Sequence, residues 1–356
     1  MTTKQSIEKV LWSACDSFRG KIDSSRYKDY ILSMLFVKYL SDVYAETREK
    51  YVKQYDGDLR RVERAMSRER FVMDETSTFT YLYNNRNDAE IGQKINVALA
   101  AIENNNSAKL HKVFRAIDFN STVDFGEPKE KNAILKNLLE DFKDLDLRPS
   151  QLNSDDIIGD SYEYMSANFA SDAGKKGGEF YTPNKVSDLV ARLVQPKEND
   201  RIYDATCGSG GLLLKAFKQI PSGKARIYGQ EKNMQTWALC RMNMFLHNVD
   251  DAVIWHGDTL ANPGNIEDDK LMKFQCIVAN PPFSLDKWDS GFLGDAETDA
   301  KGKKPKMSAE LDPYRRFDWG IPPTSKGDYA FVMHMLHSLD DTNGRMGVIL
   351  PHGVLF

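Results

Sequence analysis

The motif Asn280-Pro281-Pro282-Phe283 has residue types that suit chemistry on a planar amino group, and it follows an apolar run at 276–279. The side-chain oxygen of Asn280 and the backbone carbonyl of Pro281 are two acceptors that prolines hold in fixed geometry. They can accept both hydrogens of an –NH2 group, which directs the nitrogen lone pair at an electrophile and stabilises charge developing on the nitrogen. Phe283 offers a face for stacking a base, which would have to be flipped out of a duplex. The alternative is a proline-rich turn without a ligand.

A glycine-rich turn, YDATCGSGG at 203–211, is the second motif. A strand is expected to end at Asp204, and Gly208, Gly210 and Gly211 permit positive φ and close backbone approach before a helix begins. The spacing fits neither the GxGxxG dinucleotide pattern nor a phosphate-binding GxxxxGK[ST] loop. An acidic residue ahead of a short glycine turn suits a zwitterionic ligand with an ammonium group. A purely structural tight turn is the alternative.

Acidic residues end the next two expected strands. Glu231, about twenty residues past the turn, can accept both hydroxyls of a ribose, or it can cap the next helix as a surface carboxylate. Asp258 can accept a hydrogen bond from an adenine amino group, or it can cap a helix or turn. The segment GEFYTP at 178–183 places an aromatic pair ahead of the first strand, where it could wall the same site, although such pairs more often belong to a core.

The elements that must position these residues alternate between strand and helix after residue 178. Short runs rich in β-branched residues occur at 201–206, 225–231, 252–258, 274–282 and 344–351, with helical patterns from Gly211, up to Asn248 and over 328–339. Such alternation predicts a parallel sheet covered by helices on both faces.

Residues 6 to about 150 have helical periodicity instead. Ile7, Leu11 and Phe18 fall on one stripe, and the stretch 27–44 is apolar on more than one face, as expected of a core helix or of one that meets a partner. We therefore predict a helical domain over 1–150, a connecting segment over 151–177 with a hinge at SDAGKKGGE (171–179), and an α/β domain over 178–356.

Composition supports two folded domains. The chain has 356 residues, of which 41% are hydrophobic and 28% charged, and it contains neither a signal peptide nor an apolar run of membrane-spanning length. Four cysteines lie far apart without CxxC spacing, so no zinc site or disulfide framework is predicted and a reducing cytoplasm is expected. The net charge of −4 suggests that a partner supplies part of any contact with nucleic-acid phosphates.

A long irregular segment at 286–326 separates the NPPF motif from the last helix. It contains the lysine-rich stretch KGKKPK at 301–306. Such a segment is either a solvated, mobile loop or a loop that contacts nucleic acid.

The order of the motifs GEFYTP, DATCGSGG, an acidic strand end, GD and NPPF resembles the modification (M) subunit of type I restriction–modification systems. The N-terminal stretches LWSACDSFRG and YKDYILSMLFVKYLSDVY, and the late stretches DYAFVMHMLHSL and GRMGVILPHGVLF, also resemble that family, so the resemblance covers nearly the whole chain. It implies a helical N-terminal domain followed by a Rossmann-like S-adenosylmethionine-dependent methyltransferase domain that methylates N6 of adenine in DNA.

The resemblance also implies roles for single residues. Glu231 would take the ribose and Asp258 the adenine of S-adenosylmethionine, while Asn280, Pro281, Pro282 and Phe283 would handle the target base. The other cofactor-binding residues implied are Glu179, Phe180, Tyr181, Thr182, Pro183 and Asn184 around the pocket, and Asp204, Gly208, Ser209, Gly210 and Gly211 at the methionine end. The implied partners are double-stranded DNA, a specificity (S) subunit, a second M subunit and a restriction (R) subunit.

Two features depart from the family pattern. Ala205 follows Asp204 where many members have proline, which should matter little, and the sequence stops at Phe356 just after the fifth expected strand. We therefore expect the C-terminal part of the methyltransferase domain to be missing and an apolar sheet edge to be exposed at 348–350. RNA or protein-glutamine methylation and a non-catalytic scaffold role remain the alternatives.

Overall fold

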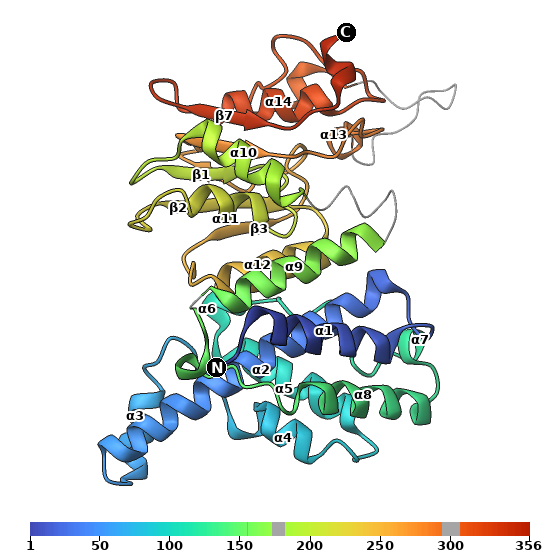
Figure 1. Ribbon diagram of the computed structural model, residues 1–356. Helices are drawn as coiled ribbons and strands as arrows, with labels where there is room; N and C mark the ends of the chain where they lie inside the picture. Colours follow the sequence, from blue (N-terminus) through green and yellow to red (C-terminus); the bar gives the residue numbers. More distant parts are fainter. Residues whose placement is uncertain (155, 173–181, 294–306) are drawn as a thin grey trace. The chain divides into compact units, whose positions relative to one another are not determined.

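The computed structural model describes residues 1–154, 156–172, 182–293 and 307–356 (Figure 1). The chain divides into two compact units, one comprising Met1–Gly174 with Phe245–His247 and the other Lys175–Met244 with Asn248–Phe356. Within the described ranges, no helix combines the length and the apolar character needed to cross a membrane.

The first unit is helical. Its longest element, α2 (Ser24–Gln54), buries Ile31, Leu35 and Phe36 completely, which confirms a helix that is enclosed on more than one face. Thr3 caps α1 (Lys4–Phe18) through a reciprocal capping box with Ser6. The remaining helices of this unit are α3 (Leu59–Met66), α4 (Phe79–Asn84), α5 (Ile91–Asn105), α6 (Ser107–Leu110), α7 (Thr122–Phe125), α8 (Pro128–Phe142) and α9 (Ile157–Asp172), with short 3-10 turns at Glu75–Ser77 and Pro149–Gln151.

The segment predicted to connect two domains contains a regular element. Helix α9 packs on α1 and α2 of the helical unit and buries Tyr162, Met165 and Phe169. The polar sequence before Ile157 and the small residues after Asp172 concealed a helix whose apolar face belongs to the first core. Most of the predicted hinge, residues 173–179, lies outside the described residues.

The second unit is an α/β fold with a five-stranded parallel sheet, as predicted. The strands follow the order β3-β2-β1-β6-β7, and every neighbouring pair is parallel. Their bounds are β1 (Arg201–Asp204), β2 (Arg226–Glu231), β3 (Val253–His256), β6 (Cys276–Ala279) and β7 (Arg345–Val348), each shorter than its apolar run. The helices are α10 (Asn184–Val194), α11 (Gly211–Phe217), α12 (Met234–Leu246), α13 (Ser290–Leu293) and α14 (Asp328–His337), and a small hairpin joins β4 (Ile266–Glu267) to β5 (Lys270–Leu271).

The sheet reverses its direction of growth between β1 and β6. The chain adds β2 and then β3 on one side of β1, and then returns to place β6 on the other side. In open α/β sheets this reversal opens a crevice at the carboxyl ends of the strands. The last strand, β7, lies at the sheet edge, where Val348 and its neighbours Ile349 and Leu350 are partly buried.

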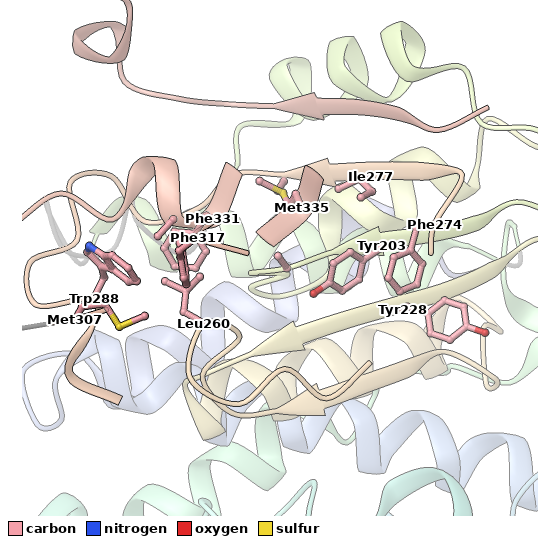
Figure 2. Packing of buried hydrophobic residues seen from close by; sticks show 13 residues of the cluster. Tyr203, Tyr228, Leu260, Phe274, Ile277, Trp288, Met307, Phe317, Phe331 and Met335 are labelled. Atoms are coloured by element: carbon pink, nitrogen blue, oxygen red, sulfur yellow. The ribbon is translucent and has the colours of Figure 1, made fainter. Parts of the chain in front are cut away.

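Part of the segment predicted as an irregular loop belongs to the core of the second unit. Met307 and Phe317 are buried in one hydrophobic cluster with Trp288 and with Phe331 and Met335 of α14 (Figure 2). The prediction of a solvated, mobile loop is therefore wrong for residues 307–317, because apolar side chains anchor them. The lysine-rich stretch 301–306 lies outside the described residues.

All four cysteines are buried and free, in agreement with the absence of a predicted disulfide framework. The Sγ atoms of Cys207 and Cys240 lie 3.9 Å apart in the packing between the glycine turn and α12. These two thiols therefore act as small apolar groups that fill the space beneath the turn.

Candidate active site

The chemistry-bearing residues of the second unit follow the carboxyl ends of four parallel strands. Asp204 ends β1 and Glu231 ends β2, while Asp258 and Asn280 come shortly after β3 and β6. Because the strands are parallel, their carboxyl ends lie along the same end of the sheet. The β1–β6 reversal lies between Asp204 and Asn280. The fold thus brings to the carboxyl-terminal end of the sheet residues that are up to 76 positions apart in sequence, from Asp204 to Asn280.

The glycine turn needs its glycines for two different reasons. Gly208 (φ 55°) and Gly210 (φ 83°) both adopt the left-handed backbone region, which disfavours residues with a Cβ. Gly210 also caps α11, and a Cβ at this position would lie 2.5 Å from Cε of Met244 and 2.8 Å from Sγ of Cys240. The turn is therefore pressed against α12.

Gly210→Ala is expected to destabilise the second unit by about 2 to 4 kcal/mol, because left-handed strain adds to overpacking. The matched control is Gly223→Ala, since Gly223 also has positive φ (63°) but its nearest neighbour would be Cζ of Phe217 at an ordinary 3.8 Å. The control should lose only about 1 kcal/mol. Denaturant unfolding followed by tryptophan fluorescence compares them, and equal losses would show that the Met244 and Cys240 contacts carry no penalty.

Two carboxylates beside the turn are buried. Asp204 is 2% exposed and accepts a hydrogen bond from the Thr206 N–H at 2.8 Å. Glu231 is 8% exposed and accepts from the N–H groups of Gly208 at 3.1 Å and Asn233 at 2.7 Å. Burial raises the pKa of both acids, that of Asp204 to about 7, and the Glu231 charge adds to the Asp204 effect. A cationic ligand would offset this penalty.

Asp204 should make stability depend on pH. The folded protein holds its proton up to about pH 7, whereas the unfolded chain releases it near pH 4, so the free energy of unfolding falls between these values as pH rises. Asp204→Asn keeps an acceptor for Thr206 and removes this titration. Relative to the unaltered protein, the variant should gain on the order of a few kcal/mol on going from pH 5 to pH 8. If urea unfolding gives the same difference in free energy of unfolding between the variant and the unaltered protein at both pH values, the effect is contradicted.

Asp258 makes contacts that match the capping alternative. Its Oδ1 accepts hydrogen bonds from the N–H groups of Leu260 (2.9 Å) and Ala261 (3.3 Å), and its Oδ2 pairs with Nζ of the exposed Lys232 at 2.8 Å. Glu231 likewise receives the N–H of Asn233 just ahead of α12. Both acids therefore hold the loops of the candidate site in shape, and their ligand roles stay predictions.

Asn280 is oriented by a residue from a distant motif. Its Nδ2 donates a hydrogen bond to Oγ1 of Thr182 at 3.1 Å, across 98 residues of sequence. Its Oδ1 is buried and, in the described part of the chain, accepts no hydrogen bond. A buried acceptor without a partner is costly, so this oxygen is suited to a donor on a ligand. The aromatic ring of Phe283, three residues later, is 46% exposed and open for stacking.

The loop after the NPPF motif is held by hydrogen bonds to the start of α14. The N–H of Ser284 (φ 52°) donates to the buried carboxylate of Asp328 at 3.0 Å. The N–H of Gly327 donates to the Leu285 carbonyl at 2.9 Å. These bonds fix the position of Phe283 from the direction of α14.

A buried polar network lies beneath the site. The guanidinium of Arg316, with no exposed surface, pairs with Asp312 at 2.8 Å and donates to the carbonyls of Thr259 (3.2 Å) and Leu260 (2.6 Å). Its Nη1 also lies 3.1 Å from Nδ1 of His334, whose Nε2 lies 2.9 Å from the Tyr203 hydroxyl. Burial and the neighbouring guanidinium lower the pKa of His334, so the ring is neutral and accepts from Arg316.

This network links the two strand ends that carry Asp204 and Asp258, because Tyr203 precedes one and Thr259 follows the other. Thr259 Oγ1 also donates to the Ala205 carbonyl at 2.5 Å. Arg316, Asp312 and His334 were not predicted from the sequence as site residues. The spacing Asp312–Arg316 and the aromatic Phe317 beside it were the available signals.

The described residues fit a ligand that carries both a cation and vicinal hydroxyls. Asp204 is a buried acid that could face a cation, Glu231 is a second buried acid that could face hydroxyls, and the glycine turn permits close backbone approach. Thr182, Pro183 and Asn184 lead into α10, which packs on α11, β6 and β7. Three predicted pocket residues, Glu179, Phe180 and Tyr181, lie outside the described residues.

Two family models match this chain and show to which protein family it belongs. The model of N-6 DNA methylases matches residues 153–356, and the model of the HsdM N-terminal domain matches residues 7–142. The chain belongs to the methylase subunits of type I restriction–modification systems. The resemblance drawn from the order of the motifs is thereby confirmed.

Relatives of this methylase subunit match along nearly its full length. The MpnII methylase subunit of Mycoplasma pneumoniae is 31% identical over 99% of this chain and 69% of its own, and the MjaVIII methylase subunit of Methanocaldococcus jannaschii is 30% identical over 99% and 59%. The crystal structure of the type I restriction-modification methyltransferase subunit from Streptococcus thermophilus covers 100% of this chain and 76% of its own, with a TM-score of 0.79 and 29% identity.

The methylase chain is thus shorter than its relatives. It spans 58% to 69% of the curated relatives that match it along almost its whole length. The fold class expected from the sequence, a helical N-terminal domain followed by an α/β methyltransferase domain, is confirmed by the structure and by the Streptococcus thermophilus neighbour.

Proposed function

We propose that this chain transfers a methyl group from S-adenosylmethionine to N6 of an adenine flipped out of double-stranded DNA. The observation that carries the proposal is the buried Oδ1 of Asn280, which lacks a partner among the described residues and is oriented by Thr182 at the β1–β6 reversal. An exocyclic amino group carries the donors that this acceptor requires. The matching family is that of N-6 DNA methylases.

The residues of the NPPF loop would act on the nitrogen directly. Asn280 Oδ1 and the Pro281 carbonyl would accept hydrogen bonds from the two N–H groups of the amino nitrogen. Both hydrogens then point away from the side on which the nitrogen lone pair faces the methyl group. As the nitrogen bonds to the methyl group and the methyl–sulfur bond breaks, the nitrogen would become positive until it releases a proton to water. Both acceptors would stabilise that charge without reorganising. The half-exposed ring of Phe283 would stack on the purine and hold it outside the duplex.

The cofactor would lie along the ends of β1, β2 and β3. S-adenosylmethionine supplies an electrophilic methyl group when it is bound. Asp204 would hold the ammonium end beside the backbone of Gly208, Ser209, Gly210 and Gly211, and Glu231 would hold the ribose hydroxyls. Asp258 would accept from the adenine amino group, for which its bond to exposed Lys232 would have to give way. The two buried acids beside the glycine turn would thus face the two groups of the ligand that can offset their burial.

We also propose that the site on DNA is chosen by another chain. The sequence is acidic overall, with a net charge of −4, whereas proteins that grip DNA alone usually carry a basic balance. A specificity subunit would read the sequence, a second methylase subunit would join it, and a restriction subunit would complete the assembly. The matched relatives are named as subunits of type I restriction enzymes.

The test is methyl transfer from labelled S-adenosylmethionine, with the chain co-purified with its specificity subunit. Duplex DNA, RNA and protein are offered in parallel, and the labelled product is digested and identified. Label in N6-methyladenine supports the proposal. Label in RNA or in protein glutamine would move the function to those substrates, and cofactor binding without transfer to any substrate would favour a scaffold role.

A further inference from the structure

Helix α3 of the helical unit carries a stripe of arginines on one face. The stripe consists of Arg60, Arg61, Arg64 and Arg68, of which the first three lie in α3 and the last follows it. At 3.6 residues per turn, their positions lie within about 100° of one another. The buried residues Val62 and Met66 lie on the opposite side of the helix. All four arginines are exposed.

These charges are not neutralised by neighbouring acids. No ion pair within the described ranges involves any of the four. Two of the three acids between residues 58 and 70 accept other hydrogen bonds, since Asp58 caps α3 through the N–H groups of Arg60 and Arg61 and Glu69 accepts the Tyr51 hydroxyl. The segment 58–70 contains five arginines against three acids, in a chain whose net charge is −4.

Two aromatic rings lie beside the arginine stripe. The guanidinium of Arg61 lies 4.9 Å from the ring centroid of Tyr55, and the rings of Tyr55 and Tyr51 are stacked with centroids 5.9 Å apart. These rings line a shallow cleft between the end of α2 and α3, together with Arg61, Arg64, Arg68 and Glu69. Within the helical unit, the end of α2 and α3 project away from α1 and α8 (Figure 1). The stripe is therefore both preorganised and accessible.

We propose that the arginine stripe of α3 binds the phosphate backbone of duplex DNA. Guanidinium groups bind phosphate oxygens in a bidentate manner, and a row of them without counter-charges fits a polyanion. A protein partner would need an apolar centre to its interface. The stripe itself presents no large exposed hydrophobic side chain, since Leu59, the one exposed along α3, lies nearer the buried face. The inference rests on the proposed function only for the choice of DNA as the polyanion.

The stripe would add positive charge that the whole chain lacks. Phosphate contacts position a protein on DNA without reading its sequence. The stripe would therefore strengthen binding to any duplex and leave the choice of site to the specificity subunit. Each arginine that neutralises a phosphate should add about 0.9 to the slope of log K against log salt concentration.

The experiment measures that slope for the full chain and a labelled duplex of random sequence, about 30 base pairs long, titrated at about 50 to 200 mM salt. The test variant is Arg60→Gln/Arg64→Gln/Arg68→Gln. A control with the same charge change in the same unit is Lys21→Gln/Lys129→Gln/Lys136→Gln, which alters three exposed lysines. A third variant, Arg60→Lys/Arg64→Lys/Arg68→Lys, keeps the charge. Thermal unfolding of each variant confirms that the exposed substitutions leave the fold intact.

The glutamine variant of the stripe should reduce the magnitude of the slope by about 2 to 3 and weaken binding by roughly tenfold or more at 0.1 M salt. The lysine control and the charge-preserving variant should keep the slope of the unaltered chain. Equal slopes for the stripe variant and the lysine control would overturn the inference, as would an unaltered chain that binds no duplex at low salt. Methyl transfer is assayed separately, so failure of the proposed function leaves this comparison decisive for the stripe.

Discussion

Asn280→Ala is expected to lower kcat for methyl transfer by about 100- to 1000-fold, the effect of removing one preorganised group that stabilises developing charge. The dissociation constant of S-adenosylmethionine should change by less than about threefold, because the substitution acts on the acceptor of the base. The loss should therefore appear in kcat at saturating cofactor. Single-turnover transfer to DNA and isothermal titration with the cofactor measure the two quantities.

The matched control is Asn280→Asp. Aspartate has the same shape and keeps an oxygen where Oδ1 lies, and the Thr182 hydroxyl, which now accepts from Nδ2 at 3.1 Å, can rotate to donate to the other oxygen. This variant should retain at least about tenfold more activity than the alanine variant. If both lose activity equally, the acceptor is not the feature that matters, and if both remain fully active, the NPPF loop is not the catalytic site.

Asp312→Ala is expected to destabilise the second unit by about 3 to 5 kcal/mol, the typical result of leaving a buried charge without its partner. Arg316 has no exposed surface and Asp312 is 2% exposed, so water cannot replace the lost carboxylate. Denaturant unfolding followed by tryptophan fluorescence reports mainly on this unit, because four of the five tryptophans, Trp237, Trp255, Trp288 and Trp319, lie in it and only Trp12 lies in the first unit. A loss below about 1 kcal/mol would show that the pair is solvated in solution.

The control for this prediction is Asp312→Leu/Arg316→Met, which removes both charges and keeps the volume apolar. It should recover part of the stability, since replacing a whole buried pair is often nearly neutral. The carbonyls of Thr259 and Leu260 would still lose their donors, so the loop after Asp258 should loosen. The cofactor dissociation constant should rise about tenfold while stability recovers. If the free energy of unfolding recovers and the cofactor dissociation constant stays that of the unaltered protein, the network only stabilises the fold.

The fold class was predictable because its signals are local. Strand-helix alternation after residue 178 predicted the parallel sheet that the structure contains, and each strand fell within its apolar run. The breadth of the apolar surface over 27–44 predicted an enclosed helix, and residues 30–37 of α2 are buried. The same approach overlooked α9, since its neighbours in sequence are polar and small and its apolar face becomes meaningful only against α1 and α2.

The candidate residues were also identified from local patterns, and their roles as ligands stay predictions. Asp204, Glu231, Asp258 and Asn280 were chosen for their type and their place after a strand, and the order of the motifs led to the family that the comparisons confirmed. Asp258 shows the limit of such reasoning, because a carboxylate after a strand can bind a ligand or cap a turn with the same atoms. In the structure it caps the turn and pairs with Lys232.

The family, the parallel sheet and the strand ends that carry the candidate residues could be predicted from local patterns, because periodicity and short motifs are properties of neighbouring residues. Which distant groups meet depends on how the chain packs in three dimensions. Thr182 reaches Asn280 across 98 residues, and Arg316, a residue type that is usually exposed, is buried under the turn after Asp258. Partners of this kind depend on the β1–β6 reversal and on core packing of residues 307–317, which no local pattern specifies.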